Sequence, residues 1–275
     1  MLKLFTLQAG RFWLCDMKPS TSMKRLSLFG AATTWLVSAS PAKADLFLSA
    51  DCNIADPLIG LYNQVPGIDT GNQQFFANIL GSGTSVAVLH TGTPQYDPSG
   101  QIVTDVNQFY NGLAGKTSTV ISGTISSLAG YNLLVVPLPD HAFTSGEITV
   151  LRNFLAAGNS VFFLGENDSF TLENPNINND LTALGSSMQI VPAGFDAGWH
   201  TATGSQIASD PFTTGVSHFS YAAPSMVSGG NYLFFGTGAQ PFVTYSAVVP
   251  EPSTVSLACL SVLALASRLR RSGRL

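Results

Sequence analysis

The stretch 131–165, YNLLVVPLPDHAFTSGEITVLRNFLAAGNSVFFLG, carries the pattern that decides the fold. Its two apolar runs, 131–137 and 160–164, are short and continuous, which is typical of strands buried on both faces. Between them, apolar residues recur at helical spacing. Thr144, followed three residues later by Glu147, forms a capping-box pattern that starts a helix. The stretch therefore predicts a strand–helix–strand unit of a parallel sheet.

The flanking sequence continues this alternation. The run 85–90 predicts a strand, 104–113 a helix with Thr104 as its N-cap, and 119–121 a further strand. The residues 73–80 favour a helix before the first of these strands. Later in the chain we expect a loop at 168–180, a helix–strand pair at 178–184 and 188–191, and β-rich runs at 216–219, 232–235 and 242–245 that extend the sheet in antiparallel fashion.

The expected fold class is α/β, a flavodoxin-like parallel sheet sandwiched by helices with a β-rich C-terminal extension. Over 85–191 the order of elements resembles the class I glutamine amidotransferase-like fold. In the catalytic family the strand after the long helix ends in Gly-x-Cys-x-Gly, whereas this chain has Gly165-Glu166-Asn167-Asp168-Ser169. Asn167 stands where the nucleophilic Cys would be, and an amide cannot replace a thiolate. The resemblance therefore implies the fold without the amidotransferase chemistry.

Charge is segregated along the 275 residues. Between Asp45 and Val248 the only basic residues are Lys116 and Arg152, against 14 acidic residues, which gives a formal charge of 2 − 14 = −12. Binding to nucleic acid phosphates requires Lys and Arg, so we expect no nucleic-acid partner. Cys52 is the only cysteine of this central region. An internal disulfide and a Cys-rich zinc site are therefore both excluded there.

The N-terminal region has the three parts of a secretory signal peptide in the correct order. A basic head at 23–25 precedes the apolar run 26–37, and the small-residue pattern Ala42-Lys43-Ala44 follows. We therefore assign 23–44 to a signal peptide cut between Ala44 and Asp45, with the Sec export machinery as partner. Residues 1–22 are interpreted as an N-terminal extension or a misassigned start, and 45–248 as the exported domain.

The C-terminal residues 249–275 form a second targeting segment. Val249-Pro250-Glu251-Pro252-Ser253 leads into the apolar run 255–266, and a basic cluster with Arg268, Arg270 and Arg271 follows. This order resembles the PEP-CTERM sorting signal, which exosortase handles in Gram-negative bacteria that make exopolysaccharide. The resemblance implies a transient inner-membrane intermediate with a short transmembrane helix, and then a place at the cell surface or in the extracellular matrix.

Polar residues follow the ends of the predicted parallel strands, where sites form in such sheets. Glu166, Asn167 and Asp168 follow one strand, His141 another, and His90 ends a third. These five residues are the candidate ligand or cation site. Carboxylate and amide oxygens suit calcium, so calcium is the one cofactor that the sequence leaves open. The other interpretation is a set of polar turns.

No catalytic motif accompanies these residues. We therefore expect a non-catalytic domain with a binding or structural role in an exopolysaccharide or biofilm context, and exopolysaccharide as a partner. Two alternatives stay open. One is a degenerate amidotransferase-like hydrolase that acts on a glycan or peptide through Glu166, Asp168 and His141. The other is a solute-binding module, which requires a sizeable pocket at the same strand ends.

Overall fold

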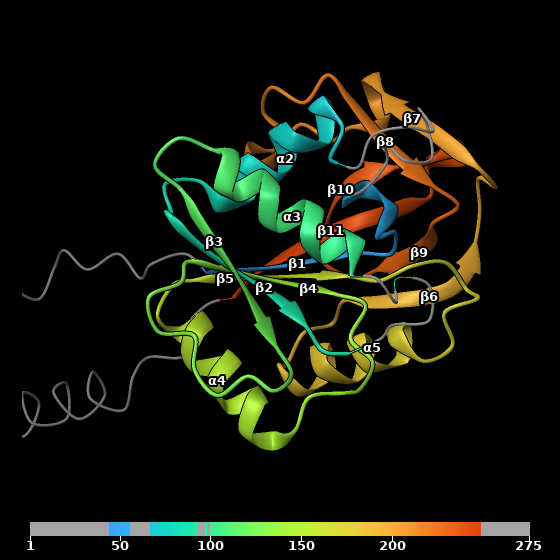
Figure 1. Ribbon diagram of the computed structural model, residues 1–275. Coiled ribbons are helices and arrows are strands. Elements are labelled where there is room, and N and C mark those ends of the chain that lie inside the picture. Colours follow the sequence, from blue (N-terminus) through green and yellow to red (C-terminus); the bar gives the residue numbers. More distant parts are fainter. Residues whose placement is uncertain (1–43, 56–66, 93–96, 98–99, 249–275) are drawn as a thin grey trace, which may run out of the picture. The chain divides into compact units, whose positions relative to one another are not determined.

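The computed structural model describes residues 44–55, 67–92, 97 and 100–248. In these residues a seven-stranded sheet has the order β10-β11-β1-β5-β4-β2-β3 (Figure 1). The five strands from β1 to β3 in this order run parallel, and β11 and β10 continue the sheet in antiparallel fashion. The strands are β1 (Ala44–Ser49), β2 (Ser85–His90), β3 (Thr117–Ser122), β4 (Leu133–Pro137), β5 (Ser160–Leu164), β10 (Asn231–Phe235) and β11 (Pro241–Val248). The expected α/β class with a mostly parallel central sheet is confirmed.

Helices cover both faces of this sheet. Figure 1 shows α2 and α3 on one side of the sheet and α4 and α5 on the other. The strand β5 shows how the core divides, because Phe162 and Leu164 join the apolar cluster under α2 and α3, while Val161 and Phe163 join the one under α4 and α5. The helices are α2 (Thr70–Leu80), α3 (Gln101–Gly112), α4 (Ser145–Ala156) and α5 (Glu173–Ala183).

The capping box predicted at the start of α4 is present. The Thr144 side chain accepts a hydrogen bond from the Glu147 amide, and Glu147 Oε2 accepts one from the Thr144 amide at 2.9 Å. Amides at the start of a helix have no acceptors within the helix, and the capping box supplies acceptors for two of them.

We expect Thr144→Ala to lower the free energy of unfolding by about 1 kcal/mol, because it leaves the Glu147 amide without its acceptor. Urea denaturation measures this change. Thr149→Ala is the matched control, since Thr149 lies in the same helix and its hydroxyl only donates to the Ser145 carbonyl. Equal losses in the two variants would contradict a specific role of the cap.

The start of α3 differs from the prediction. The helix begins at Gln101, not at Thr104, and Gly100 occupies the N-cap position with φ 67°. The Asp97 carboxylate caps it instead, by accepting from the Gln101 and Ile102 amides at 2.7 and 3.0 Å. Thr104 lies inside the helix, where its hydroxyl donates to the Gly100 carbonyl. The capping carboxylate lies four residues before the first helical residue, so the simple N-cap rule missed it.

The helix predicted at 178–184 is present as α5 but begins earlier, at Glu173, so the expected loop at 168–180 is wrong in its second half. The segment is rich in Asn, which has a low intrinsic helix propensity. Tertiary hydrogen bonds explain the helix: Asn178 receives a bond from the Ile190 amide and donates to the Ile190 carbonyl, and Asn176 donates to the Pro139 carbonyl.

The C-terminal β-rich region is divided between the main sheet and two ribbons. The strands β10 and β11 extend the sheet as predicted. Of the run 216–219, expected in the same extension, only His218 and Phe219 lie in a strand, and this strand, β8 (His218–Ala222), pairs instead with β7 (Trp199–Thr203). A second ribbon joins β6 (Gln189–Gly194) to β9 (Ser225–Ser228).

The strand β1 is not among the predicted strands, although it lies inside the sheet between β11 and β5. Ala44, part of the predicted cleavage site with Ala42 and Asp45, is its first residue and pairs with Val248. Ala42, the remainder of the signal peptide, residues 1–22 and the segment 249–275 lie outside the described residues. In the described ranges, no helix combines the length and apolarity that crossing a bilayer requires.

Candidate functional site at the carboxyl ends of β1 and β5

The neighbouring parallel strands β1 and β5 end at the same edge of the sheet, and the candidate site lies there. Asp51 and Cys52 follow β1, while Glu166 and Asn167 follow β5. The Gly165 amide donates to the Ser49 carbonyl at 2.8 Å and holds the two strand ends together. A Cβ atom at Gly165 would come within 2.3 Å of Ile190 Cδ1 and 2.8 Å of Asn174 Oδ1, so a larger residue here would displace these two side chains.

Glu166 is the centre of the site. Its side chain is buried, and both carboxylate oxygens accept hydrogen bonds. Oε2 accepts from the Cys52 amide at 3.2 Å, from Cys52 Sγ at 2.9 Å and from Asn53 Nδ2 at 2.8 Å. Oε1 accepts from the amide and the side chain of Asn167 at 3.0 and 3.1 Å. The Glu166 carboxylate is therefore fully engaged by the protein itself.

Asp51 is buried beside this group and connects it to the C-terminal half of the domain. Its carboxylate accepts from the Asn53 amide at 2.8 Å and from the Ala222 amide, in β8, at 2.7 Å. Burial raises the pKa of Asp51 to about 7. Burial, and then the charge of Asp51, raises the pKa of Glu166 well above its ordinary value. Two neighbouring buried carboxyl groups do not both ionise readily, so they favour holding a proton at neutral pH.

Cys52 is the free cysteine of this site and is buried. Burial, together with the charges of Glu166 and Asp51, raises the pKa of its thiol well above the ordinary value. A thiol in this state donates to Glu166 and is a poor nucleophile, because nucleophilic attack requires the thiolate. Cys52 was not among the predicted site residues. The signal that points to it is the polar run Asp51-Cys52-Asn53 directly after an apolar segment.

Asn174, from the first turn of α5, fixes the backbone that carries Glu166 and Asn167. Its side chain accepts from the Glu166 amide at 3.0 Å and donates to the carbonyls of Glu166 and Asn167 at 2.7 and 2.9 Å. Sequence reasoning missed this residue because it lies in the segment interpreted as a loop. Asn167 lies in the site as predicted, and its own side chain accepts from the Ser169 amide.

The other three predicted site residues have different partners. Asp168 is exposed. The His141 Nδ1 atom lies 2.6 Å from Asp140 Oδ1, and His90 Nε2 is buried without a hydrogen-bond partner among the described residues. Across the described ranges, neither histidine is hydrogen-bonded to Glu166. This arrangement does not favour the acid–base pair that the hydrolase alternative requires.

Asp180 lies near His141 but belongs to a separate polar group. Its Oδ1 atom accepts from the Phe143 amide at 2.7 Å, and Oδ2 is buried without a partner in the described part of the chain. Burial raises the pKa of Asp180 to about 7. This carboxyl therefore resembles Asp51 in its chemistry, although it is not part of the Glu166 site.

A pocket of about 300 Å³ opens beside Glu166. Its lining combines apolar side chains with amide and hydroxyl groups. Leu138, which lines it, has φ 42°, a left-handed conformation that a non-glycine residue rarely adopts, and residues strained in this way are frequent at functional sites. The lining residues are Cys52, Asn53, Ile102, Leu138, Glu166, Asn167, Ser169 and Phe170.

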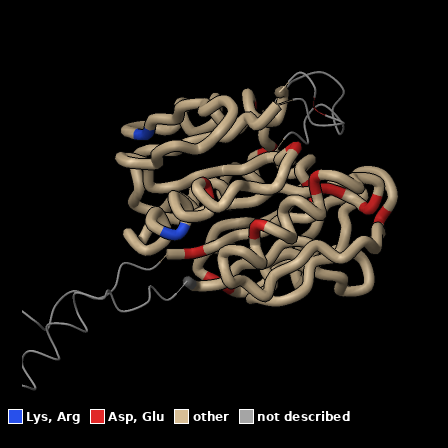
Figure 2. Tube along the Cα trace, turned by 90° about the horizontal axis from the view of Figure 1, so that it is seen from below, with Lys and Arg blue, Asp and Glu red and all other residues tan. Residues whose placement is uncertain are grey.

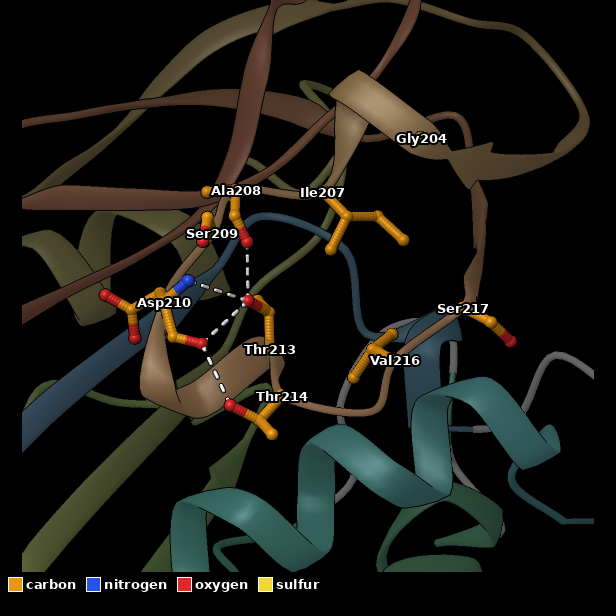
Figure 3. Close-up of a pocket in the computed structure, with 9 residues that line it drawn as sticks. All are labelled: Gly204, Ile207, Ala208, Ser209, Asp210, Thr213, Thr214, Val216 and Ser217. Atoms are coloured by element: carbon orange, nitrogen blue, oxygen red, sulfur yellow. Dashed lines mark hydrogen bonds between the residues drawn. The ribbon is translucent and has the colours of Figure 1, made fainter.

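A second hollow of about 400 Å³ lies by the loops between β7 and β8 (Figure 3). Its polar groups bond to one another. Thr213 Oγ1 donates to the Ala208 and Asp210 carbonyls and accepts from the Asp210 amide, while Thr214 Oγ1 donates to the Asp210 carbonyl. These bonds stabilise the loop. We place the candidate site in the pocket beside Glu166, because that pocket lies at the carboxyl ends of the parallel strands, where sites form in such sheets.

The geometry does not favour the calcium that the sequence left open. Calcium takes six to eight oxygen ligands, chiefly carboxylates and carbonyls. Both Glu166 oxygens already accept bonds from N–H and S–H donors, and Asp168 does not join them. The described ranges contain no group of three or more His, Cys, Asp or Glu side chains arranged to hold a metal ion.

One comparison with known proteins gives a match. Residues 248–271 match the PEP-CTERM protein-sorting motif. The chain is therefore a substrate of exosortase. It is exported, passes through a membrane-associated sorting step and reaches the cell surface. No curated protein and no solved structure matches the chain.

Proposed function

We propose that the exported domain is a non-catalytic binding domain whose pocket beside Glu166 holds a sugar unit of an exopolysaccharide. The observation that carries this proposal is the mixed lining of the pocket. Ile102, Leu138 and Phe170 offer apolar side chains, and Asn53 and Asn167 offer amide groups. A sugar ring has an apolar face and a hydroxyl edge, so it can contact both kinds of group.

The engaged carboxylate supports binding over catalysis. Glu166 orients the side chains of Asn53 and Asn167 through bonds of 2.8 and 3.1 Å. Amides that are held in place lose little entropy when they bind a ligand. A hydrolase would instead need a carboxyl group free to exchange protons with its substrate. The exosortase motif adds the context, because an exported surface protein meets the polysaccharides outside the cell.

The test is a titration of the exported chain with polysaccharide purified from a Gram-negative producing cell, first with calcium and then with chelator. We expect saturable binding that survives chelation, because the Glu166 site has no free carboxylate for a cation. Binding that requires calcium would contradict the assignment to this pocket. Absence of binding in both conditions would overturn the polysaccharide partner.

The substitution Ser169→Trp tests whether the polysaccharide binds in the pocket beside Glu166. Ser169 is exposed and lines the pocket, so a large ring there should fill the entrance and weaken binding at least tenfold, about 1.4 kcal/mol, with little effect on folding. Ser82→Trp is the matched control, since Ser82 is exposed at the opposite edge of the sheet and lines a different hollow. Loss of binding in the Ser82 variant alone would place the ligand at that other edge.

The pocket also favours the solute-binding alternative, since it lies at the strand ends where such a module requires one. Its volume of about 300 Å³ is at the lower end of the usual range for small-molecule sites. Titration with monosaccharides separates the two functions. A free sugar that binds as tightly as the polymer indicates a solute-binding module, whereas binding of the polymer alone indicates a matrix protein.

A further inference from the structure

The described chain begins and ends at one edge of the sheet. Ala44, the first residue of β1, pairs with Val248, the last residue of β11, and the two strands stay in register over six residue pairs. The parallel strands β1 and β5 begin at this edge, which we call the amino edge. A hollow here is lined by Asp45, Ser82 and Ser160, among others.

The sorting motif starts at the amino edge without a spacer. It matches residues 248–271, so its first residue is also the last residue of β11. The apolar run of the motif starts at Val255. Seven residues of fully extended chain reach at most about 25 Å, so the amino edge cannot lie farther than this from the start of that run. The predicted cut between Ala44 and Asp45 would release the signal peptide at the same edge.

The pocket beside Glu166 lies at the opposite edge, which we call the carboxyl edge. The strand β1 separates the two edges, and its six residues span about 20 Å. Asp51 and Cys52 follow its end and Glu166 follows the parallel strand β5, so the whole site lies beyond the end of the sheet farthest from the sorting motif.

Charge divides between the two edges in the same direction. Lys116 bonds to the Gly81 and Gly83 carbonyls at the amino edge, and Arg152, from the second half of α4, bonds to the Ala183 carbonyl near the end of α5. In Figure 2 the blue segments lie toward the left of the tube, and red segments lie on both its left and its right. At the carboxyl edge, the side chain of Asp168 is exposed and that of Asp140 is partly exposed, whereas Asp51, Asp97 and Glu166 are buried there and Asp45 is buried at the amino edge. A surface with anionic lipids repels carboxylates and attracts Lys and Arg.

The sorting motif tethers the domain to the membrane at the amino edge. From this position and from the charges at the two edges, we infer that during the sorting step the domain faces the lipid surface with its amino edge and holds the pocket beside Glu166 away from the membrane. The pocket is then open to large extracellular molecules before exosortase acts. The inference rests on the sorting motif and the strand register, and it does not depend on which ligand the pocket binds.

The test compares two exposed serines at opposite edges, Ser82 at the amino edge and Ser169 at the carboxyl edge. Each is changed to cysteine in a full chain whose Cys15 and Cys259 are serine, and each is labelled with a fluorophore. The chain is inserted into vesicles of phosphatidylethanolamine and phosphatidylglycerol that carry nitroxide-labelled headgroups. The chain without an introduced cysteine is treated with the fluorophore in the same way to measure background labelling, and thermal unfolding confirms that each variant folds.

We expect at least about threefold stronger quenching at position 82 than at position 169, because the two edges differ by about 20 Å in height above the lipid. Equal or inverted quenching would overturn the inference. A chain that lacks residues 249–275 should lose quenching at both positions. If it retains the difference, the tether does not orient the domain and the inference fails. The Ser169→Trp titration tests the pocket's ligand separately.

Discussion

Replacing Phe75 by alanine is expected to lower the free energy of unfolding by about 3–5 kcal/mol. Phe75 comes from α2 and is fully buried. Its ring lies 5.8 Å from Phe162 in β5, 5.5 Å from Phe219 in β8 and 5.1 Å from Phe234 in β10, all edge-on. The truncation removes this shared centre and leaves a cavity among strands from both halves of the domain.

The loss is a large part of the 5–15 kcal/mol that stabilises a typical domain. Urea denaturation of the two proteins measures it. Tyr232→Ala is the control, because Tyr232 is 38% exposed and its ring contacts only Phe235 at 6.1 Å among the described aromatic side chains. The control should lose no more than about 1 kcal/mol. Similar losses in both variants would mean that the aromatic cluster does not join the two halves.

The second prediction is that the domain becomes less stable as the pH rises from about 4 to about 7. Asp51 and Asp180 have ordinary pKa values of 3.8, and burial raises both to about 7. Between these values the folded state holds protons that the unfolded state has lost. The free energy of unfolding therefore falls as pH rises, by at most about 1.4 kcal/mol per pH unit for each such proton.

Other carboxyl groups make the domain less stable at low pH. Burial acts to raise the pKa of Glu147, but hydrogen bonds from Ile125 and Thr144 outweigh it and hold that pKa below the ordinary value. For Asp196, burial is likewise outweighed by bonds from Tyr221 and Thr237. Their stabilisation is present above the unfolded pKa and is lost as pH falls through the folded pKa. Stability should therefore be greatest near pH 4–5.

Two variants show which carboxyl groups cause the fall of the free energy of unfolding with rising pH. Glu166→Gln removes one charge of the buried pair with Asp51 and should flatten the profile between pH 5 and 8. Asp180→Asn removes the separate contribution of Asp180 and should stabilise the domain at pH 8, because it deletes a buried charge whose Oδ2 has no partner in the described residues. Chemical denaturation at a series of pH values measures both. A wild-type stability that increases from pH 5 to 7 would contradict the prediction.

The prediction agrees with the structure where an element depends on burial or on local hydrogen bonds, and it differs where the bonds reach residues far away in the chain. The strands 85–90 and 160–164 have the same bounds in the structure as in the prediction, since a continuous apolar run depends only on burial. The α4 cap was found because both of its partners are local. The strand β1 was missed because its short run follows the predicted cleavage site. The part of α5 before residue 178 was missed because the side-chain bonds of Asn174 and Asn176 reach backbone outside the helix.

The candidate site was only partly predictable for the same reason. Glu166 and Asn167 were found because they follow an evident strand. Asp51, Cys52 and Asn53 belong to the same site only because β1 inserts next to β5, more than 100 residues later in the chain. His141 was grouped with Glu166 from its place at a strand end, but its side chain bonds to Asp140. A shared edge brings backbones together, whereas side-chain direction decides which groups meet.

By itself, the sequence determined the sorting motif at 248–271, the acidic character of the exported region and the alternation of strands and helices, because these depend on composition and short-range pattern. Only the tertiary structure decided that β1 and β11 pair, that Glu166 is engaged by Cys52 and Asn53, and that the pocket lies at the edge opposite the sorting motif. Each of these depends on contacts between residues far apart in the chain, and no local pattern encodes such contacts.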